Sequence, residues 1–354
     1  MNPIRYLQTV SSINRNRTVL PSMLTFITTF RCNAKCIMCD SWKKKQADDL
    51  NTQEIEKIFY QLPRMDFTRL SGGEPFIRND IHDIYDMCVK ILDSSAVHIT
   101  TNGFLTEKIV NLCEKRNRAK PLFLLLSLDG TEDNHNYIRG RRNAWKLANR
   151  TLSYLGPRQK ELNIRLNVNQ TIVDNEGIAQ HDELRKHLSQ FDIGCNVVIA
   201  YDSSATYSTD ISNSSVPGQI GEFSPFGKLD TEGLSTILSL PKKHSGWNSL
   251  AERTAKKYYY AGIRNRLFYK FNSPNPKCVA LNSHLRIMPD GTVPVCQFNS
   301  AAAGNLRTQT FSEIWNSRKT EHLREWIRTC PGCWAECEIL PNAVYSGDIL
   351  RHVF

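Results

Sequence analysis

The sequence predicts an α/β fold in which βα units surround a parallel sheet, followed by a small cysteine-rich region. Two observations support this fold class. From about residue 23 to residue 201, short β-rich runs alternate with segments whose apolar residues have helical spacing. All but three of the eleven cysteines fall into two groups, one near each end of the chain.

The strands are predicted from short apolar runs with turn residues on either side. No such run approaches the roughly 20 residues that a membrane-spanning helix needs. We expect six strands, and they are Met23–Phe30, Phe67–Ser71, Ala96–Thr101, Phe123–Leu128, Asn163–Val173 and Asn196–Tyr201.

Helices between the strands carry their own start signals. Asn51 with Glu54 three residues later forms a capping-box pattern, and Asn79 precedes a second apolar stripe at helical spacing. The three isolated cysteines fall on apolar positions, where thiols usually pack in the core. For these three, burial is favoured over a functional role, and they are Cys88, Cys113 and Cys195.

Composition divides the chain into four parts. Residues 1–22 form an N-terminal extension, and residues 23–201 form the core of βα units. Residues 202–270 combine a Ser/Gly/Pro-rich loop with a basic, tyrosine-rich helical segment. That segment either packs its aromatic side chains on the core or offers a platform to an anionic substrate. Residues 271–354 form the cysteine-rich region.

The bulk properties limit the partners and the compartment. A formal net charge of +10 favours an anionic partner: a phosphorylated metabolite, nucleic acid, an acidic peptide or an anionic membrane surface. The N-terminal stretch lacks the apolar region of a signal peptide, so we expect a cytoplasmic protein. Disulfides do not persist in that reducing compartment, so clustered cysteines there indicate metal.

The first cysteine group lies directly after the first predicted strand. Cys32, Cys36 and Cys39 place three thiolates on one short loop with no fourth Cys or His nearby. Zinc in structural sites is closed by four ligands, so this spacing disfavours zinc. Three thiolates leave one iron of a cubane cluster open, as a catalytic site requires.

This C-x3-C-x2-C loop resembles the hallmark of the radical S-adenosylmethionine (SAM) superfamily. The resemblance implies a partial (β/α)6 barrel resembling a TIM barrel, a [4Fe–4S] cluster that binds SAM, and an electron donor such as flavodoxin or ferredoxin. Reductive cleavage of SAM then gives a 5′-deoxyadenosyl radical, which abstracts a hydrogen from the substrate. Met38 stands where the superfamily usually has an aromatic residue before the third cysteine, so adenine packing is expected to differ.

Further segments match the superfamily in order along the chain. Gly72-Gly73-Glu74-Pro75 resembles its GGEP segment, which receives the SAM amino group. Two candidates have an alternative: Asp129 caps a turn or contacts SAM, and Arg139 pairs with the SAM carboxylate or bridges to a helix. By resemblance, the remaining SAM-facing candidates are Asn102, Ser127, Asn167 and Asn169.

The second cysteine group suits either zinc or an iron–sulfur cluster on chemical grounds. We expect a hairpin from Leu285 to Cys296, with its turn at residues 289–291. A cysteine, a glycine and a cysteine five residues after that glycine resemble the SPASM/twitch extension, which implies an auxiliary [4Fe–4S] cluster. Its expected ligands are Cys278, Cys296, Cys330 and Cys333, with Cys337 as a spare, an alternative metal ligand or an active-site thiol.

The predicted function is therefore radical SAM chemistry, of an oxidoreductase type because an auxiliary cluster can accept an electron from a substrate radical. The substrate is a peptide, a sugar derivative or a lipid-linked intermediate, and the sequence does not choose among them. A zinc-dependent nucleic-acid-binding module is the alternative. It accounts for the charge and the second cysteine group, but not for the cysteine triad followed by GGEP.

Overall fold

The computed structural model describes residues 3–44, 48–200, 229–239, 250–330 and 332–352. In this part of the chain, one curved parallel sheet has the strand order β6-β5-β4-β3-β2-β1-β7, and β8 and β9 form a separate antiparallel pair. The strands are β1 (Met23–Ile27), β2 (Phe67–Ser71), β3 (Ala96–Thr101), β4 (Leu122–Ser127), β5 (Ile164–Ile172), β6 (Gly194–Ile199), β7 (His284–Ile287), β8 (Thr292–Pro294) and β9 (Ala302–Asn305).

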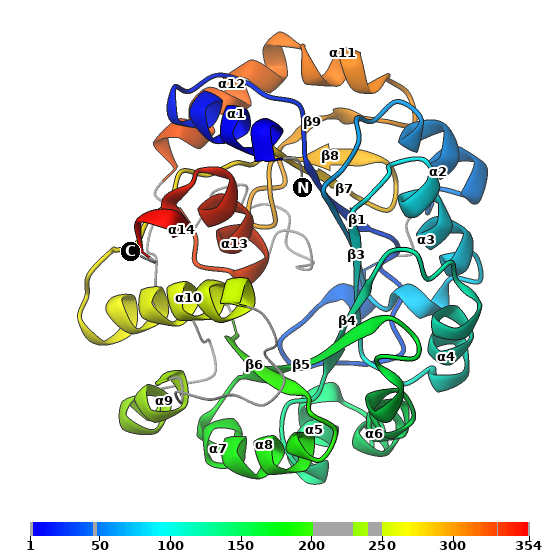
Figure 1. The fold of residues 1–354 in the computed structure, drawn as a ribbon, viewed down its shortest axis with the longest axis vertical. Helices are drawn as coiled ribbons and strands as arrows, with labels where there is room; N and C mark the ends of the chain where they lie inside the picture. The colour runs from blue at the N-terminus through cyan, green and yellow to red at the C-terminus, as the bar shows by residue number, and fades with distance from the viewer. Residues whose placement is uncertain (1–2, 45–47, 201–228, 240–249, 331, 353–354) are drawn as a thin grey trace.

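Helices surround the outside of the sheet, and α10 and α13 stand beside its open side, between β6 and β7 (Figure 1). Short 3-10 turns cover residues 41–43, 75–77 and 156–158. The helices are α1 (Pro3–Asn14), α2 (Thr52–Phe59), α3 (Ile81–Lys90), α4 (Thr106–Lys115), α5 (Glu132–Arg139), α6 (Ala144–Leu155), α7 (Asn175–Ala179), α8 (His181–Ser189), α9 (Thr231–Leu238), α10 (Leu250–Phe268), α11 (Phe311–Trp315), α12 (Arg318–Thr329), α13 (Glu336–Tyr345) and α14 (Asp348–Arg351).

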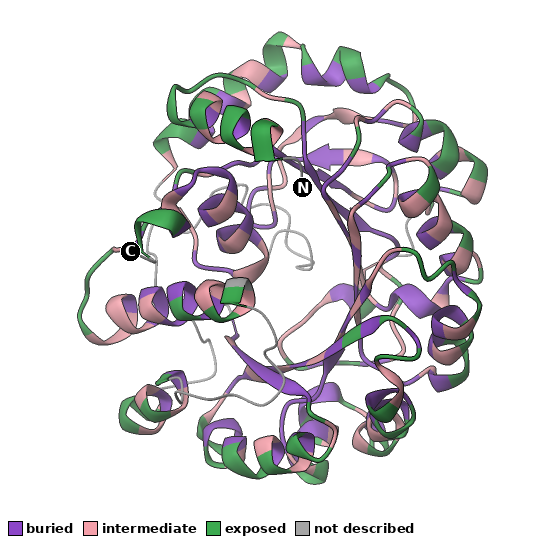
Figure 2. Cartoon of the chain, in the orientation of Figure 1, coloured by how far each residue is buried: buried purple, intermediate pink, exposed green. Residues whose placement is uncertain are grey.

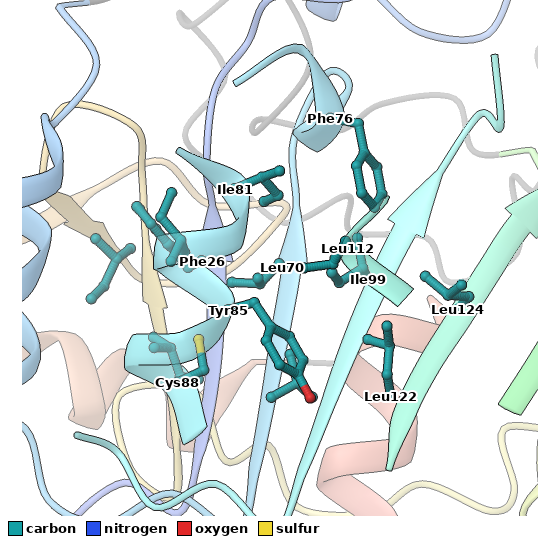
Figure 3. Packing of buried hydrophobic residues seen from close by; sticks show 14 of the residues in the cluster. Phe26, Leu70, Phe76, Ile81, Tyr85, Cys88, Ile99, Leu112, Leu122 and Leu124 are labelled. Atoms are coloured by element: carbon teal, nitrogen blue, oxygen red, sulfur yellow. The ribbon is translucent and has the colours of Figure 1, made fainter. Parts of the chain in front are cut away.

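The alternation of side chains along each strand separates the core from the inside of the barrel. Leu70 and Ile99 are fully buried under helices such as α3, and the core includes the thiol of Cys88 (Figure 3). Their neighbours on β2 and β3 point to the opposite face and are only half-buried. We call this concave face the lumen face. Burial is concentrated in the strands, whereas the outer sides of the helices are exposed (Figure 2).

Most sequence expectations for the core are confirmed. The capping box of α2 is present, with Asn51 Oδ1 accepting from the Glu54 N–H at 2.9 Å. Helix α3, by contrast, begins at Ile81 and not directly after Asn79, with Asp80 at its N-cap. Strands β2 and β3 have the predicted limits, whereas the limits of the other four predicted strands differ from the structure by up to three residues, and Tyr201 lies outside the described residues. Cys88, Cys113 and Cys195 are buried, as expected.

The predicted hairpin from Leu285 to Cys296 is wrong. Strand β7 instead joins the main sheet, where Met23 of β1 pairs with His284 in parallel, and β8 pairs with β9. The turn at residues 289–291 exists, because the Gly291 N–H donates to the Met288 carbonyl at 3.0 Å. Local alternation cannot reveal that the free edge of β1 captures β7, since this pairing joins residues that are far apart in the chain.

The basic, tyrosine-rich segment is helical over the described part of it, α10, while residues 242–249 lie outside the described residues. Tyr258, Tyr259 and Tyr260 are buried, and the Tyr260 hydroxyl accepts a hydrogen bond from the Val197 N–H at 2.8 Å. These three tyrosines therefore pack against the barrel, as the first interpretation expected. Among the described helices, none has the length and apolar character to cross a membrane.

Candidate functional site

The first cysteine loop begins where β1 ends and is held in place by its neighbours' backbone. The N–H groups of Lys35 and Ile37 donate to carbonyls at the end of α5, each at 3.0 Å. The Ser41 hydroxyl donates to the Phe30 carbonyl at 2.9 Å and closes the loop at its far side. Gly140 follows α5 with φ of +60°, and a Cβ there would lie 2.4 Å from the Lys35 carbonyl oxygen. Only glycine permits this close approach.

The three thiols of this loop lie together, with Cys36 buried and Cys32 and Cys39 partly buried. Burial raises the pKa of Cys32 to about 12 and that of Cys39 to about 11, and in both cases the neighbouring cysteines add to the increase. The backbone N–H of Ala34 donates to the Cys32 sulfur, and that of Ser41 donates to the Cys39 sulfur, each at 3.5 Å. N–H donors aimed at sulfur favour the thiolate form, which is the form that binds metal.

The two glycines of the GGEP segment pack directly against the backbone that leads into the cysteine loop. A Cβ on Gly72 would lie 2.4 Å from the Thr29 carbonyl oxygen, and one on Gly73 would lie 2.3 Å from the Arg31 carbonyl oxygen. The N–H groups of Gly73 and Glu74 donate to the carbonyls of Thr29 and Arg31 at 2.7 and 2.9 Å. The glycines therefore join the end of β2 to the end of β1.

Glu74 is fully buried and links the ends of β2 and β3. Its carboxylate accepts from the Asn102 N–H at 2.7 Å, the Thr101 hydroxyl at 2.8 Å and the Phe76 N–H at 3.1 Å. Burial raises the pKa of Glu74 to about 7, and these hydrogen bonds limit the increase. Pro75 follows at the first position of a 3-10 turn. A contact between this carboxylate and a SAM ammonium stays a prediction.

Asn102 lies between the end of β3 and the cysteine loop. Its Nδ2 donates to Asn33 Oδ1 at 2.7 Å, and its Oδ1 accepts from the Phe104 N–H at 3.0 Å. The same Nδ2 lies 4.0 Å from the Cys32 sulfur. Asn102 thus adjoins the first thiol, and its contact with SAM stays a prediction.

Arg139 and Asp129 form a buried ion pair that reaches the second thiol. Two guanidinium nitrogens of Arg139 donate to the two Asp129 oxygens at 2.6 and 2.8 Å, and the third donates to the Cys36 sulfur at 3.6 Å. Burial alone would raise the pKa of Asp129, but Arg139 and His135 lower it to about 2. Asp129 also accepts from the Thr171 N–H at 3.0 Å, so it ties α5 to β5 and does not cap a turn.

Polar side chains line the lumen face at the ends of β4, β5 and β6. Ser127 pairs in register with Asn169, and Asn169 pairs with Asn196, so the three side chains form one row. Asn167 lies on the same face, one pleat earlier on β5. The Asn169 Oδ1 is buried and has no hydrogen-bond partner in the described part of the chain. A buried amide oxygen without a partner fits a site that is completed by a ligand with donor groups, such as SAM.

Two features of the site complete this description. Met38 packs against Ile138 of α5 and against Val173 and Ala200, which follow β5 and β6. Asn196 was not among the sequence candidates, although it is buried and lies in the row with Ser127 and Asn169. In the sequence, the alternating asparagines of β5 indicate a polar face on that strand. Only the strand register shows that Asn196 of β6 extends this face.

The second cysteine group is assembled from segments far apart in the chain. Burial raises the pKa of Cys278, and Cys296 and Cys330 raise it further. Burial, Glu338, Cys296 and Cys278 raise the pKa of Cys333. Cys296, Cys330 and Cys333 also pack against the same buried pair, Phe298 and Ala335, so the four expected ligands lie in one neighbourhood. A cavity of about 350 Å³, lined by residues that include Cys278, Cys330 and Arg324, opens beside them.

Cys337 lies at the edge of this group. Its thiol donates to the Gln297 side-chain oxygen, and burial together with Glu338 raises its pKa to about 11. Within the described residues, no three His, Cys, Asp or Glu side chains are arranged to hold a single metal ion. Ligands of a cubane cluster bind different irons and need not converge on one point.

Comparison with known proteins identifies two regions. Residues 26–186 match the model of the radical SAM superfamily, and residues 278–335 match that of the SPASM iron–sulfur cluster-binding domain. The GTP 3′,8-cyclase of Aquifex aeolicus is 25% identical over 325 residues, which cover 85% of this chain and 90% of the cyclase.

Two other similarities extend along most of the chain. The molybdenum cofactor biosynthesis protein 1 of Dictyostelium discoideum is 26% identical over 325 residues, covering 89% of this chain but 46% of that protein. The crystal structure of Streptococcus suis SuiB bound to the precursor peptide SuiA aligns with a TM-score of 0.60 at 15% identity. The alignment covers 93% of this chain and 72% of SuiB. At 15% identity, this similarity supports a shared fold and nothing beyond it.

Proposed function

Because the chain carries a radical SAM domain followed by a C-terminal SPASM domain, we propose that it abstracts a hydrogen atom from its substrate by radical SAM chemistry. When bound, SAM and its [4Fe–4S] cluster supply a 5′-deoxyadenosyl radical for this abstraction. The observation that supports the proposal most directly is the position of the three-thiol loop. Cys32, Cys36 and Cys39 lie on one short loop at the carboxyl end of β1, where βα barrels carry their active sites.

The residues around the loop have separable roles in this proposal. Cys32, Cys36 and Cys39 hold the cluster, and Arg139 donates to the Cys36 sulfur. Ser127 and Asn169 face SAM from the lumen, with Asn169 offering its unpartnered oxygen to a donor group. Glu74 fixes the ends of β2 and β3 that surround the site.

For the second group, we propose an auxiliary [4Fe–4S] cluster on Cys278, Cys296, Cys330 and Cys333. Such a cluster can take one electron from a substrate radical, so the net reaction would be an oxidation. A low-potential donor such as flavodoxin or ferredoxin, in the reducing cytoplasm, would supply the electron that cleaves SAM. The proteins similar to this chain include a cyclase of GTP and a protein bound to a precursor peptide, so we add a nucleotide to the candidate substrates, which are otherwise a peptide, a sugar derivative and a lipid-linked intermediate.

Anaerobic reconstitution tests the proposal. Two cubane clusters predict about eight irons per chain, and dithionite with SAM should yield 5′-deoxyadenosine. Cys32→Ala should abolish that product, whereas Cys88→Ala, which changes a thiol buried in the core, should retain it. A chain that binds zinc alone, or that cleaves no SAM with its clusters loaded, would contradict the proposal and restore the zinc-dependent nucleic-acid-binding alternative.

A further inference from the structure

A second polar row crosses the lumen face below the SAM site. In register, Arg286 of β7 lies beside Thr25 of β1, Thr25 beside Arg69 of β2, and Arg69 beside His98 of β3. Because these residues occupy equivalent positions on adjacent parallel strands, their side chains point to the same side of the sheet. The row faces the auxiliary cysteines, since Arg69 donates to the Cys337 carbonyl at 3.2 Å.

The carboxylates near this row are already paired. Arg286 forms an ion pair with Glu338, and His284 also lies 3.4 Å from Glu338. Lys256 of α10 forms an ion pair with Glu336. Glu338 and Glu336 therefore each have a cation of their own.

Arg69 is the remaining cation of this group. Among the ion pairs of the described residues, none includes Arg69, and its Nε is buried without a hydrogen-bond partner. The Nδ1 of the adjacent His98 is likewise buried and unpartnered. Removing even part of a guanidinium from water costs free energy unless the charge is paired. Within the described residues, two neighbouring nitrogens thus lack a hydrogen-bond partner and the Arg69 charge lacks an ion-pair partner, which fits the binding of an anionic group.

The lumen face gives this missing anion access. Arg69 and His98 are half-buried, whereas Leu70 and Ile99, their neighbours on the same strands, are fully buried under the helices. An arginine fork matches the paired oxygens of a carboxylate or phosphate. We propose that Arg69 and His98 bind an anionic group of the substrate, a carboxylate or a phosphate, between the SAM site and the auxiliary cysteines.

This inference rests on the proposed function, because it places the substrate in the lumen between two clusters. It adds that the substrate carries a negative charge which anchors it at β2 and β3. Such an anchor would position the substrate, while the abstraction of hydrogen would take place nearer the ends of the strands.

Calorimetry on the reconstituted holoenzyme tests the inference, with inorganic phosphate and succinate as probes and glycerol as an uncharged control. We expect phosphate or succinate to bind, and the tighter of the two identifies the anionic group. Arg69→Gln should weaken that binding at least about tenfold, the effect of losing a charge-assisted contact. Arg150→Gln, which removes an exposed arginine charge, should bind as the wild type does.

Iron content and thermal melting show whether each variant folds. If Arg69→Gln does not fold, His98→Gln and Arg69→Lys provide the test, and each should weaken the binding. Wild type that binds neither anion, or folded variants at residues 69 and 98 that bind as wild type does, would overturn the inference. Wild type that binds the anion at Arg69 but cleaves no SAM would contradict the proposed function instead.

Discussion

The two cysteine groups are positioned by different means. The first lies on one loop, and backbone contacts at the ends of β1, β2 and α5 hold it. In the second group, Cys278 and Cys333 come from distant segments, and side-chain packing holds them. Trp334, next to Cys333, lies against Tyr258 and Tyr259 of α10, and its indole N–H donates to the Tyr259 carbonyl at 3.0 Å.

Arg266 and Gly262 complete the packing of this tryptophan. The Arg266 guanidinium lies 3.8 Å from the centre of the Trp334 ring. A Cβ on Gly262 would lie 1.8 Å from the ring itself. The comparison shows that the compact motif depends mainly on close backbone contacts, whereas the dispersed ligand set depends on the packing of a whole helix.

Breaking the backbone contact should have the largest effect. In Gly73→Ala the new Cβ meets the carbonyl oxygens of Arg31 and Phe30 at 2.3 and 2.5 Å, and backbone cannot yield as a side chain can. We expect the first cluster to be lost, iron to fall from about eight to about four per chain, and unfolding free energy to drop by about 3 kcal/mol.

Iron analysis and urea unfolding measure both effects of Gly73→Ala. Gly177→Ala is its control, because the nearest atom to a Cβ there is 3.4 Å away, an ordinary contact. Full iron content in Gly73→Ala would mean that the strand ends tolerate a side chain, which would weaken the contrast between the two regions.

The matching change in the second region is Gly262→Ala. Alanine favours helices, but its Cβ would overlap the Trp334 ring and displace the neighbouring Cys333. We expect the auxiliary cluster to be lost, the first cluster to remain, and stability to fall by about 2 kcal/mol. Electron paramagnetic resonance of the reduced protein would separate the two cluster signals, and two unchanged signals would contradict the role assigned to Trp334.

A third change tests the side-chain support of the first region. Asp129→Asn leaves the buried Arg139 without its countercharge, so we expect a loss of about 2 kcal/mol, with the cluster retained. The pKa of Asp129 is lowered to about 2, so its charge stabilises the fold above the unfolded value of about 3.9. The loss measured by urea unfolding should therefore be the same at pH 6 and pH 8. A loss that varies over this range would show that Asp129 titrates there.

The smallest effect is expected at Cys337. The thiol of Cys337 lies at the edge of the auxiliary group and donates a hydrogen bond to Gln297, so it is not one of the expected ligands. In Cys337→Ser, about eight irons per chain should therefore remain. Cys330→Ser should lose about four of them. An equal loss of iron in both variants would show that Cys337 is a ligand, and the assigned ligand set of the auxiliary cluster would then be wrong.

Much of the first region could be predicted because its features are local in the chain. The cysteine spacing, the GGEP segment and the ends of β2 and β3 were all evident before the structure, and β2 and β3 have the predicted limits. The role of Asp129 was not evident, because its partners Arg139 and Thr171 belong to different elements. Sequence spacing does not report which elements meet in space.

The sequence by itself determined the three-thiol loop and the alternation of strands and helices, because both depend on neighbouring residues. Only the tertiary structure decided that β7 extends the sheet beyond β1, that Trp334 packs Cys333 against α10, and that Arg69 faces the lumen without an ion-pair partner among the described residues. These features depend on strand register and on contacts between distant segments. Each is fixed by the free energy of the whole fold and not by any single stretch of the chain.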